Sequence, residues 1–290
     1  MPLSLLLPLL LAPADAAGIA SPYASALPRE IVEKKADEDR RRREQAAQTV
    51  DLPQSRSKAG CIGAVEADPA RSAQLARDAL GEAIGRERVR AGLCLGLALA
   101  ELDRWDEAQR AFTDARDAAE PGDDASRARL GAMAGNAALA AGRPGEALAL
   151  LAPAAVSAQS AGNRALTASI SLDRARALVA LKQPDAAFAA LAQAREAAPD
   201  DAQAWLLSAT LSRRQDKLIE AQAQIEKAAQ LAPQDPEVGL EAGVIAVLSG
   251  RPEAARKSWE AVVSLAPGSD AAKTAGQYLA QLGPEAKAAP

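Results

Sequence analysis

The two cysteines are the side chains of this sequence with the most distinctive chemistry. Cys61 and Cys94 are the only cysteines among 290 residues. Two thiols form a disulfide in an oxidising compartment and stay free in a reducing one. A bridge would close a loop of about 34 residues and add roughly 4 kcal/mol to the free energy of unfolding by the loop-entropy argument. We expect the disulfide, because the N-terminal sequence predicts export; two free thiols are the alternative.

Groups that could carry out catalysis or hold a metal ion are scarce. The sequence contains no histidine, which is the commonest metal ligand and the side chain whose ordinary pKa lies nearest neutrality. It also contains no Gly-rich phosphate loop, no Cys or His metal spacing and no Ser–His pair. The carboxylates lie at pairing distance from Lys and Arg on expected exposed helix faces, which favours a surface role over acid–base catalysis. We predict that the protein is not an enzyme and has no cofactor or metal.

Residues 1–17 have the pattern of a signal peptide. A short Leu-rich run precedes Ala14-Asp15-Ala16, whose small residues suit a cleavage site. The run is shorter than the roughly 20 apolar residues of a membrane-spanning helix, and no later stretch qualifies as a span. Two features count against a signal peptide, namely the lack of Lys or Arg before the run and Pro8 within it, so an uncleaved apolar N-terminus is the alternative. We expect a periplasmic or secreted protein, with a cytoplasmic location as the alternative.

Residues 18–60 are rich in charge or in small polar residues. Within 28–48, acids stand four residues before bases, as in Glu30–Lys34 and Asp37–Arg41, an order that favours a solvated helix. The run Arg40 to Arg43 could also bind acidic lipid or nucleic acid, but the acids directly before it cancel most of its charge. The whole chain has 34 Lys and Arg against 38 Asp and Glu, a net charge of −4. Because a basic excess is absent, we predict no nucleic-acid partner.

From residue 61 on, Ala- and Leu-rich segments alternate with short turns. Ala and Leu are strong helix formers, and a proline suits the first turn of a helix, so the pattern predicts helical hairpins. The turns contain Asp103-Arg104, Gly142-Arg143-Pro144, Lys182-Gln183-Pro184, Gln215-Asp216 and Gly250-Arg251-Pro252.

Aligned on these turns, the sequence repeats small and bulky residues in columns. Small residues would mark where two helices cross, a bulky residue would plug the space between one hairpin and the next, and a proline would end the second helix. The small column of the first helix is Gly96, Gly135, Ala175, Ala209 and Gly243. The second helix has a small column, Ala108, Ala147, Ala187, Ala221 and Ala255, and four residues later the bulky column, Phe112, Leu151, Leu191, Ile225 and Trp259. A further column is Ala115, Ala154, Ala194, Ala228 and Val262, and the closing prolines of the last three repeats are Pro199, Pro233 and Pro267.

This pattern resembles the tetratricopeptide repeat, whose motif has a small residue in the first helix, then Ala-x-x-x-Phe, a further Ala and a closing Pro. The first-column alanines lie 39, 40, 34 and 34 residues apart, and the last two intervals equal the family period. The extra residues, around 121–125 and 162–163, predict longer helices or loops in the early repeats. The resemblance covers about residues 86–267. The usual aromatic residue near the start of the first helix survives only as Trp205, and the tyrosine one turn later is absent.

The resemblance implies an all-α fold: a right-handed superhelical solenoid of antiparallel helix pairs over residues 61–284. Before the clear repeats, a helix is expected to begin at Asp68 and Pro69 and to run to about Ile84. It could be the second half of a degenerate repeat. After them, Ser269 would cap a terminal helix that covers the last open face; its apolar stripe is Tyr278, Leu279 and Leu282. Residues 18–60 would then be a disordered and charged helical segment with a linker, and 285–290 a disordered tail.

The resemblance also implies protein binding, because the first helices of such a solenoid line a concave groove that commonly takes an extended peptide or a partner's helix. The surface would grade from basic in the early and middle repeats to acidic at the end, and a merely solvated inner face is the alternative for each residue. The regular Lys and Asn set that clamps a C-terminal carboxylate in some members is absent. The expected groove residues are Arg90, Leu97, Arg129, Asn136, Asp173, Arg176, Thr210, Arg213, Glu237 and Glu241.

The three tryptophans fit the repeat columns. Trp259 occupies the bulky column and Trp205 the family's aromatic position, so both are expected in the core. Trp105 begins a second helix, where partial burial is expected. Stacking on a ligand is the alternative for each.

Together these features predict a scaffold that binds a peptide or protein segment in the groove of the solenoid and helps to assemble an envelope complex. The alternative is a structural module that self-associates through the charged N-terminal helix or the ends of the solenoid.

Overall fold

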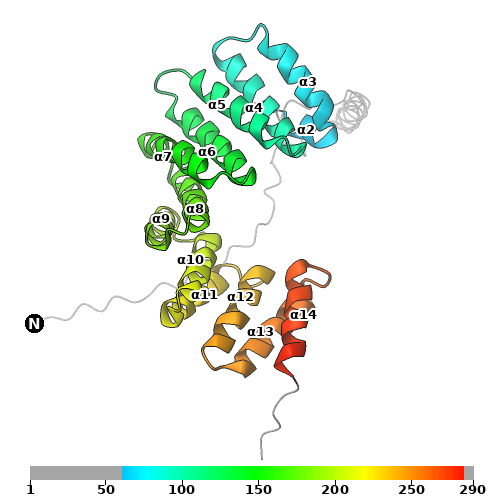
Figure 1. Cartoon of the computed structure of the whole chain (residues 1–290), viewed down its shortest axis with the longest axis vertical. Coiled ribbons are helices and arrows are strands. Elements are labelled where there is room, and N and C mark those ends of the chain that lie inside the picture. Colours follow the sequence, from blue (N-terminus) through cyan, green and yellow to red (C-terminus); the bar gives the residue numbers. More distant parts are fainter. Residues whose placement is uncertain (1–60, 284–290) are drawn as a thin grey trace, which may run out of the picture. The chain divides into compact units, whose positions relative to one another are not determined.

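The computed structural model of the chain describes residues 61–283, in which the only regular elements are helices (Figure 1). The expected signal peptide at 1–17, the segment at 18–60 and the tail at 285–290 lie outside the described residues. The helices are α2 (Ile62–Ala67), α3 (Pro69–Leu80), α4 (Gly85–Glu101), α5 (Trp105–Asp117), α6 (Asp124–Ala140), α7 (Pro144–Ser160), α8 (Arg164–Ala180), α9 (Pro184–Ala197), α10 (Ala202–Arg214), α11 (Leu218–Leu231), α12 (Pro236–Leu248), α13 (Pro252–Leu265) and α14 (Asp270–Leu282).

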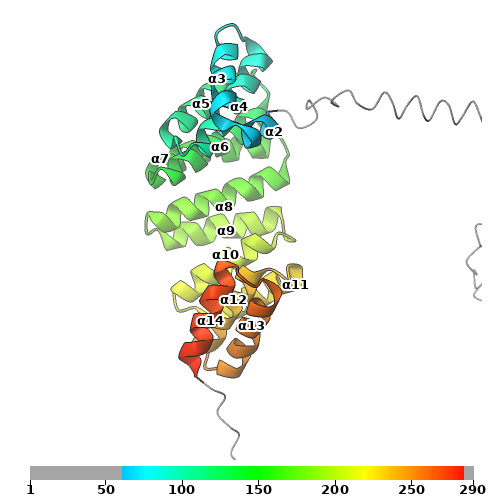
Figure 2. The same cartoon turned by 90° about the vertical axis from the view of Figure 1, so that its right-hand side faces the viewer.

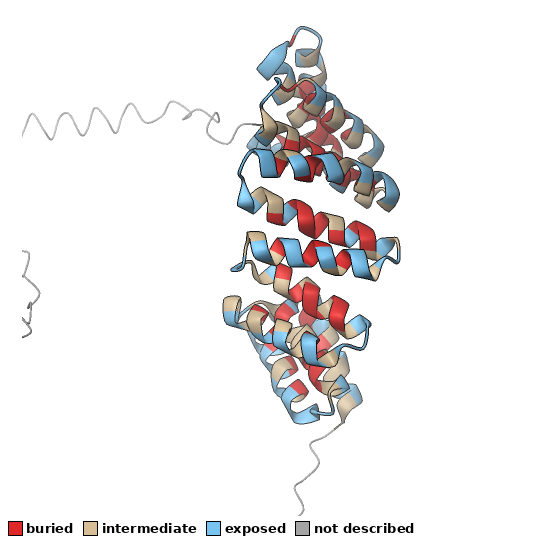
Figure 3. Ribbon diagram, turned by 90° about the vertical axis from the view of Figure 1, so that its left-hand side faces the viewer, coloured by how far each residue is buried: buried red, intermediate tan, exposed pale blue. Residues whose placement is uncertain are grey.

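The helices pair in sequence order along one stack (Figures 1 and 2). Each helix packs mainly on the helix before it and the helix after it, so α4/α5, α6/α7, α8/α9, α10/α11 and α12/α13 form five hairpins. Buried residues lie where neighbouring helices meet (Figure 3). The sequence prediction of an all-α solenoid of the tetratricopeptide type is confirmed.

The turn inside each hairpin has the same backbone geometry five times. One residue per turn has a positive φ, and the N–H of the following residue donates to a carbonyl five residues earlier at 2.9 Å, a bond that closes the end of the first helix. Glycine adopts this φ without steric strain, whereas Lys182 does not. The five residues are Asp103 (φ 55°), Gly142 (74°), Lys182 (57°), Asp216 (57°) and Gly250 (72°).

Small residues of the first helices face bulky residues of the second helices. A Cβ added to Gly135 would lie 2.6 Å from Leu151 Cγ, and one added to Gly243 would overlap the indole of Trp259. The bulky column, expected between one hairpin and the next, therefore fits first against the small residue of its own hairpin. The absent side chain is what lets the two helices approach so closely.

The early repeats are longer mainly because their helices are longer. Helices α6, α7 and α8 have 17 residues each, whereas α10 and α12 have 13 and α9, α11 and α13 have 14. The segment between α5 and α6, residues 118–123, is also longer than the segments 198–201 and 232–235 between later hairpins. Both expected causes therefore contribute.

Outside the five hairpins, the N-terminal end of the stack carries α2 and α3 and the C-terminal end carries α14. Helix α3 begins at Pro69, where Asp68 accepts the N–H of Arg71 at 2.9 Å, and ends at Leu80, earlier than expected. At the other end Ser269 Oγ accepts the N–H of Ala272 at 3.0 Å to cap α14. The apolar stripe of α14 packs on the last core cluster, as predicted for a terminal cap: Tyr278, Leu279 and Leu282.

The cysteines form a disulfide. Cys61, directly before α2, is bonded to Cys94 in α4, with 5.7 Å between the two Cα atoms. The bridge ties the short first helix to the first clear repeat.

None of the helices within residues 61–283 is both long and apolar enough to cross a membrane.

Candidate functional site

The first helices of neighbouring hairpins contact each other at two places in the stack. Contacts between equivalent helices of neighbouring hairpins join α6 to α8 and α10 to α12, which are first helices. All ten groove residues expected from the sequence lie on first helices, from Arg90 on α4 to Glu241 on α12. Along these helices, polar clusters and an open pocket follow one another.

A polar cluster joins α6 to α8. Asn136 Nδ2 donates to Asp173 Oδ2 at 2.9 Å, and Arg176 Nη1 donates to Asp173 Oδ1 at 2.6 Å. The side chain of Asp173 is only 7% exposed, against 47% for Arg176. Burial raises the pKa of Asp173, and the hydrogen bond from Asn136 and the charge of Arg176 oppose that rise. Asp173 therefore serves to orient Arg176 rather than to meet a ligand directly.

A salt bridge joins α10 to α12. Arg213 Nε lies 2.6 Å from Glu241 Oε1, and Arg213 Nη2 lies 3.2 Å from Glu241 Oε2, a two-bond fork between guanidinium and carboxylate. Both side chains are largely buried. Two residues expected to face a ligand thus face each other.

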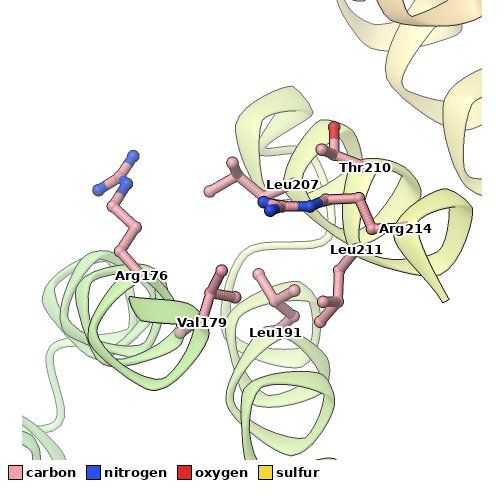
Figure 4. A pocket seen from close by; sticks show the side chains of 8 residues that line it. Arg176, Val179, Leu191, Leu207, Thr210, Leu211 and Arg214 are labelled. Carbon is pink, nitrogen blue, oxygen red and sulfur yellow. The ribbon is translucent and has the colours of Figure 1, made fainter. Parts of the chain in front are cut away.

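Between these two polar contacts, α8 and α10 leave a pocket of about 200 Å³ (Figure 4). Val179, Leu191 and Leu211 lie at its base, with Arg176 on the α8 side and Arg214 on the α10 side. The remaining lining residues are Ala175, Leu207 and Thr210. An apolar base with arginines at its edge can bury an apolar side chain and bind a neighbouring carboxylate.

Comparison with known proteins agrees with this architecture. Residues 168–211, which cover most of α8, all of α9 and most of α10, match the sequence profile described as the tetratricopeptide repeat. A search of curated protein sequences finds no match to the chain.

Solved structures of other proteins share this fold at low sequence identity. PilF of Pseudomonas aeruginosa is 16% identical with a TM-score of 0.59, covering 76% of this chain and 95% of its own. PilW, described as a widely conserved type IV pilus biogenesis factor, is 19% identical with a TM-score of 0.59, covering 72% and 91%. MamA of Desulfovibrio magneticus RS-1 is 19% identical with a TM-score of 0.51, covering 65% and 99%.

The repeat structure separates the predicted groove residues into groups. Arg176 and Thr210 line the pocket, Asn136 and Asp173 hold Arg176, and Arg213 pairs with Glu241. The other four lie apart from the pocket: Arg90, Arg129 and Glu237 are exposed, and Leu97 is partly buried against the first core cluster.

Sequence reasoning missed most of the pocket. Leu207, Leu211 and Arg214 lie with Thr210 on one stripe of α10, at the three- and four-residue spacing of a helix face. Val179 likewise lies one turn after Arg176 on α8. This spacing was readable in the sequence, but the opening between α8 and α10 was not.

The tryptophans take up core or partly covered positions. Trp259 is buried and its indole N–H donates to the Leu240 carbonyl at 3.1 Å. Trp205 is partly buried, its N–H donates to the Pro199 carbonyl at 2.9 Å, and the guanidinium of Arg195 lies 4.9 Å from its ring centroid. Trp105, at the start of α5, is also partly buried.

Within residues 61–283 no three Asp, Glu or Cys side chains gather closely enough to hold a metal ion.

Proposed function

We propose that this chain is a scaffold that binds an extended segment of another protein along its first helices, with the pocket between α8 and α10 as the main anchor site. The observation that carries the proposal is the pocket itself, in which apolar side chains and two arginines meet on the face that the first helices share. An apolar side chain of the partner would bury in the base. A carboxylate beside it would accept charge-assisted hydrogen bonds from Arg176 and Arg214.

The arginine on α8 is preorganised for this role. Asp173 accepts one N–H of Arg176, which fixes the direction of the guanidinium and leaves its other donors available. A side chain held in place before binding loses less conformational entropy when the partner arrives. The expected partner segment therefore carries an apolar residue next to Asp or Glu.

The test is capture of the partner by variants of the full chain. Arg176→Gln combined with Arg214→Glu removes the positive edge of the pocket; glutamine is chosen at 176 because an acid there would repel the buried Asp173. A matched control changes charge equally on exposed positions of second helices, with Arg110→Gln and Lys257→Glu. We expect the pocket variant to lose about tenfold or more in affinity and the control to bind normally, with unchanged circular dichroism in both. Equal binding by the two variants would remove the pocket from the binding site.

We also propose that the scaffold works in the cell envelope, where it helps to assemble a protein complex. Support comes from the Cys61–Cys94 disulfide, because disulfides persist in oxidising compartments, and from the signal-peptide pattern of residues 1–17. PilW, which has a similar fold, is described as a pilus biogenesis factor. Alkylation of thiols in intact source cells followed by mass spectrometry tests the location. We expect no alkylated cysteine, and alkylation of both cysteines would contradict the proposal.

Self-association is the second candidate function, and exposed apolar side chains at the N-terminal end of the stack favour it. Ile62 on α2 and Leu75 on α3 are both more than half exposed. Light scattering of the full chain separates the candidates: a groove-binding scaffold is expected to keep its mass when residues 18–60 are deleted or Leu75→Glu is introduced. A tight oligomer that dissociates on either change would favour self-association.

A further inference from the structure

The pocket between α8 and α10 has a counterpart farther along the stack. A second pocket, of about 360 Å³, lies among α12, α13 and α14. Five of its lining residues stand 68 residues after lining residues of the first pocket, and 68 is twice the 34-residue period of these repeats. The pairs are Arg176 and Val244, Val179 and Val247, Leu191 and Trp259, Thr210 and Tyr278, and Arg214 and Leu282.

The repeat that lies between the two pockets carries a polar contact on its first helix. One repeat after Val179 stands Arg213, and its guanidinium pairs with Glu241 on α12. Glu241 in turn stands 68 residues after Asp173, the acid of the polar cluster that precedes the first pocket. The face of the first helices thus alternates with a period of two repeats: a buried acid with its partner, a pocket, a second buried acid with its partner, and a second pocket.

The two pockets differ in charge. The positions of Arg176 and Arg214 in the first pocket are taken by Val244 and Leu282 in the second. The second pocket also contains the pair Trp259 and Tyr278, with ring centroids 5.1 Å apart, and Leu248, which is 53% exposed, at its edge. The first pocket suits an apolar residue beside an acid, and the second suits a larger apolar or aromatic residue without a neighbouring charge.

From this alternation we infer that one partner segment occupies both pockets and passes over the Arg213–Glu241 pair between them. The inference rests on the proposed groove-binding function and adds the pattern of the ligand. Helices that pack directly lie about 10 Å apart, so two steps along the first helices cover about 20 Å or more. An extended chain advances about 3.3 Å per residue, which places the two anchor residues at least about six positions apart. The segment therefore has an apolar residue next to Asp or Glu and, about six or more residues away, a second apolar or aromatic residue.

The test uses the full chain and a displayed library of random 16-residue peptides as the probe. Selected peptides are synthesised with a fluorescent label, and their dissociation constants are measured by anisotropy with the wild-type chain and three variants. Arg214→Glu alters the first pocket and Leu248→Asp the second, both at exposed positions where the fold tolerates the change. Ile219→Asp, on α11 at a residue that is 89% exposed and outside both pockets, is the matched control for Leu248→Asp.

We expect the selected peptides to show the two-anchor pattern and each pocket variant to weaken binding about tenfold or more, while Ile219→Asp has no effect. Replacing the second anchor of a peptide by Ser should make its binding indifferent to Leu248→Asp, since two changes in one contact are not additive. Weakening by Arg214→Glu alone would overturn the two-pocket inference and leave the proposed function standing. Binding that neither variant alters, or a library that yields no binder, would overturn both.

Discussion

At the scale of single residues, the stack is held by places where one helix has no side chain and its partner has a large one. A Cβ on Gly135 would lie 2.6 Å from Leu151, and a Cβ on Gly96 would overlap the ring of Phe112. Protein interiors are packed to near-crystalline density, so little space is available to relieve such an overlap. The small column of each hairpin is therefore a packing requirement and not only a consequence of the high Ala content.

Gly243→Ala tests this requirement. The new methyl group would overlap the indole of Trp259, which is buried and hydrogen-bonded to the Leu240 carbonyl, so we expect a loss of about 1–3 kcal/mol in the free energy of unfolding. Urea unfolding followed by tryptophan fluorescence measures it. The control is Gly276→Ala on α14, where a Cβ meets no atom within 4 Å and a gain of about 0.4–1 kcal/mol is expected. Equal changes in the free energy of unfolding for Gly243→Ala and Gly276→Ala would show that the close approach of α12 and α13 does not limit the size of residue 243.

A second prediction at this scale concerns the buried acid Asp173. Its pKa in the folded chain is raised by burial above the unfolded value of about 3.9, so the folded state binds more protons between these two pKa values. The contribution of Asp173 to the free energy of unfolding should therefore fall as the pH rises through this window and stay constant above it. The measurement is the difference in urea-unfolding free energy between the wild type and Asp173→Asn from pH 3.5 to 7. A difference that instead grows with pH would mean that the salt bridge to Arg176 outweighs burial.

At the scale of elements, the hairpins are defined by local signals and joined by non-local ones. Proline at the start of α7, α9 and α13 and the positive-φ residue before each second helix fix where hairpins turn. The Cys61–Cys94 bridge, with a sequence separation of 33, joins α2 to α4 at the end of the stack, where each helix has the fewest neighbours.

Removing that bridge should weaken one end of the stack selectively. For Cys61→Ala with Cys94→Ala, we expect a local loss of up to about 4 kcal/mol by the loop-entropy argument. Hydrogen exchange should then quicken in α2 and α3 and remain unchanged in α12 and α13, because each repeat is stabilised only by its neighbours. Exchange that quickens evenly along the stack would show that it unfolds as a single unit.

The sequence predicted the elements well because their signals are local. Turn residues, column residues and the Ser269 cap all lie within one hairpin or one helix end, and the turns and the cap lie where the sequence predicted them. The pocket depends on the distance between α8 and α10, which no local pattern encodes. The burial of Asp173 depends on Asn136, which lies 37 residues earlier on another hairpin. Only Arg176 and Thr210 of the ten predicted groove residues consequently line the pocket.

At the scale of the described stack, the first helices within residues 61–283 carry two pockets and the polar contacts between them. Arg213 and Glu241, predicted as ligand contacts, instead bind each other and separate two pockets. Fewer charged side chains of these helices are therefore available to a partner than the sequence predicted. The exposed cations Arg176 and Arg214 both line the pocket between α8 and α10. A partner segment recognised here would be selected by apolar residues and by acids at fixed intervals.

Photocrosslinking in the source cell addresses the binding role of the first helices most directly. A benzophenone amino acid would replace Thr210, inside the pocket between α8 and α10, or Ile219, on the outer surface of α11. We predict that position 210 forms a covalent adduct with a segment of another protein, identified by mass spectrometry, in which an apolar residue adjoins Asp or Glu, and that position 219 forms none. Adducts at 219 and none at 210 would contradict groove binding.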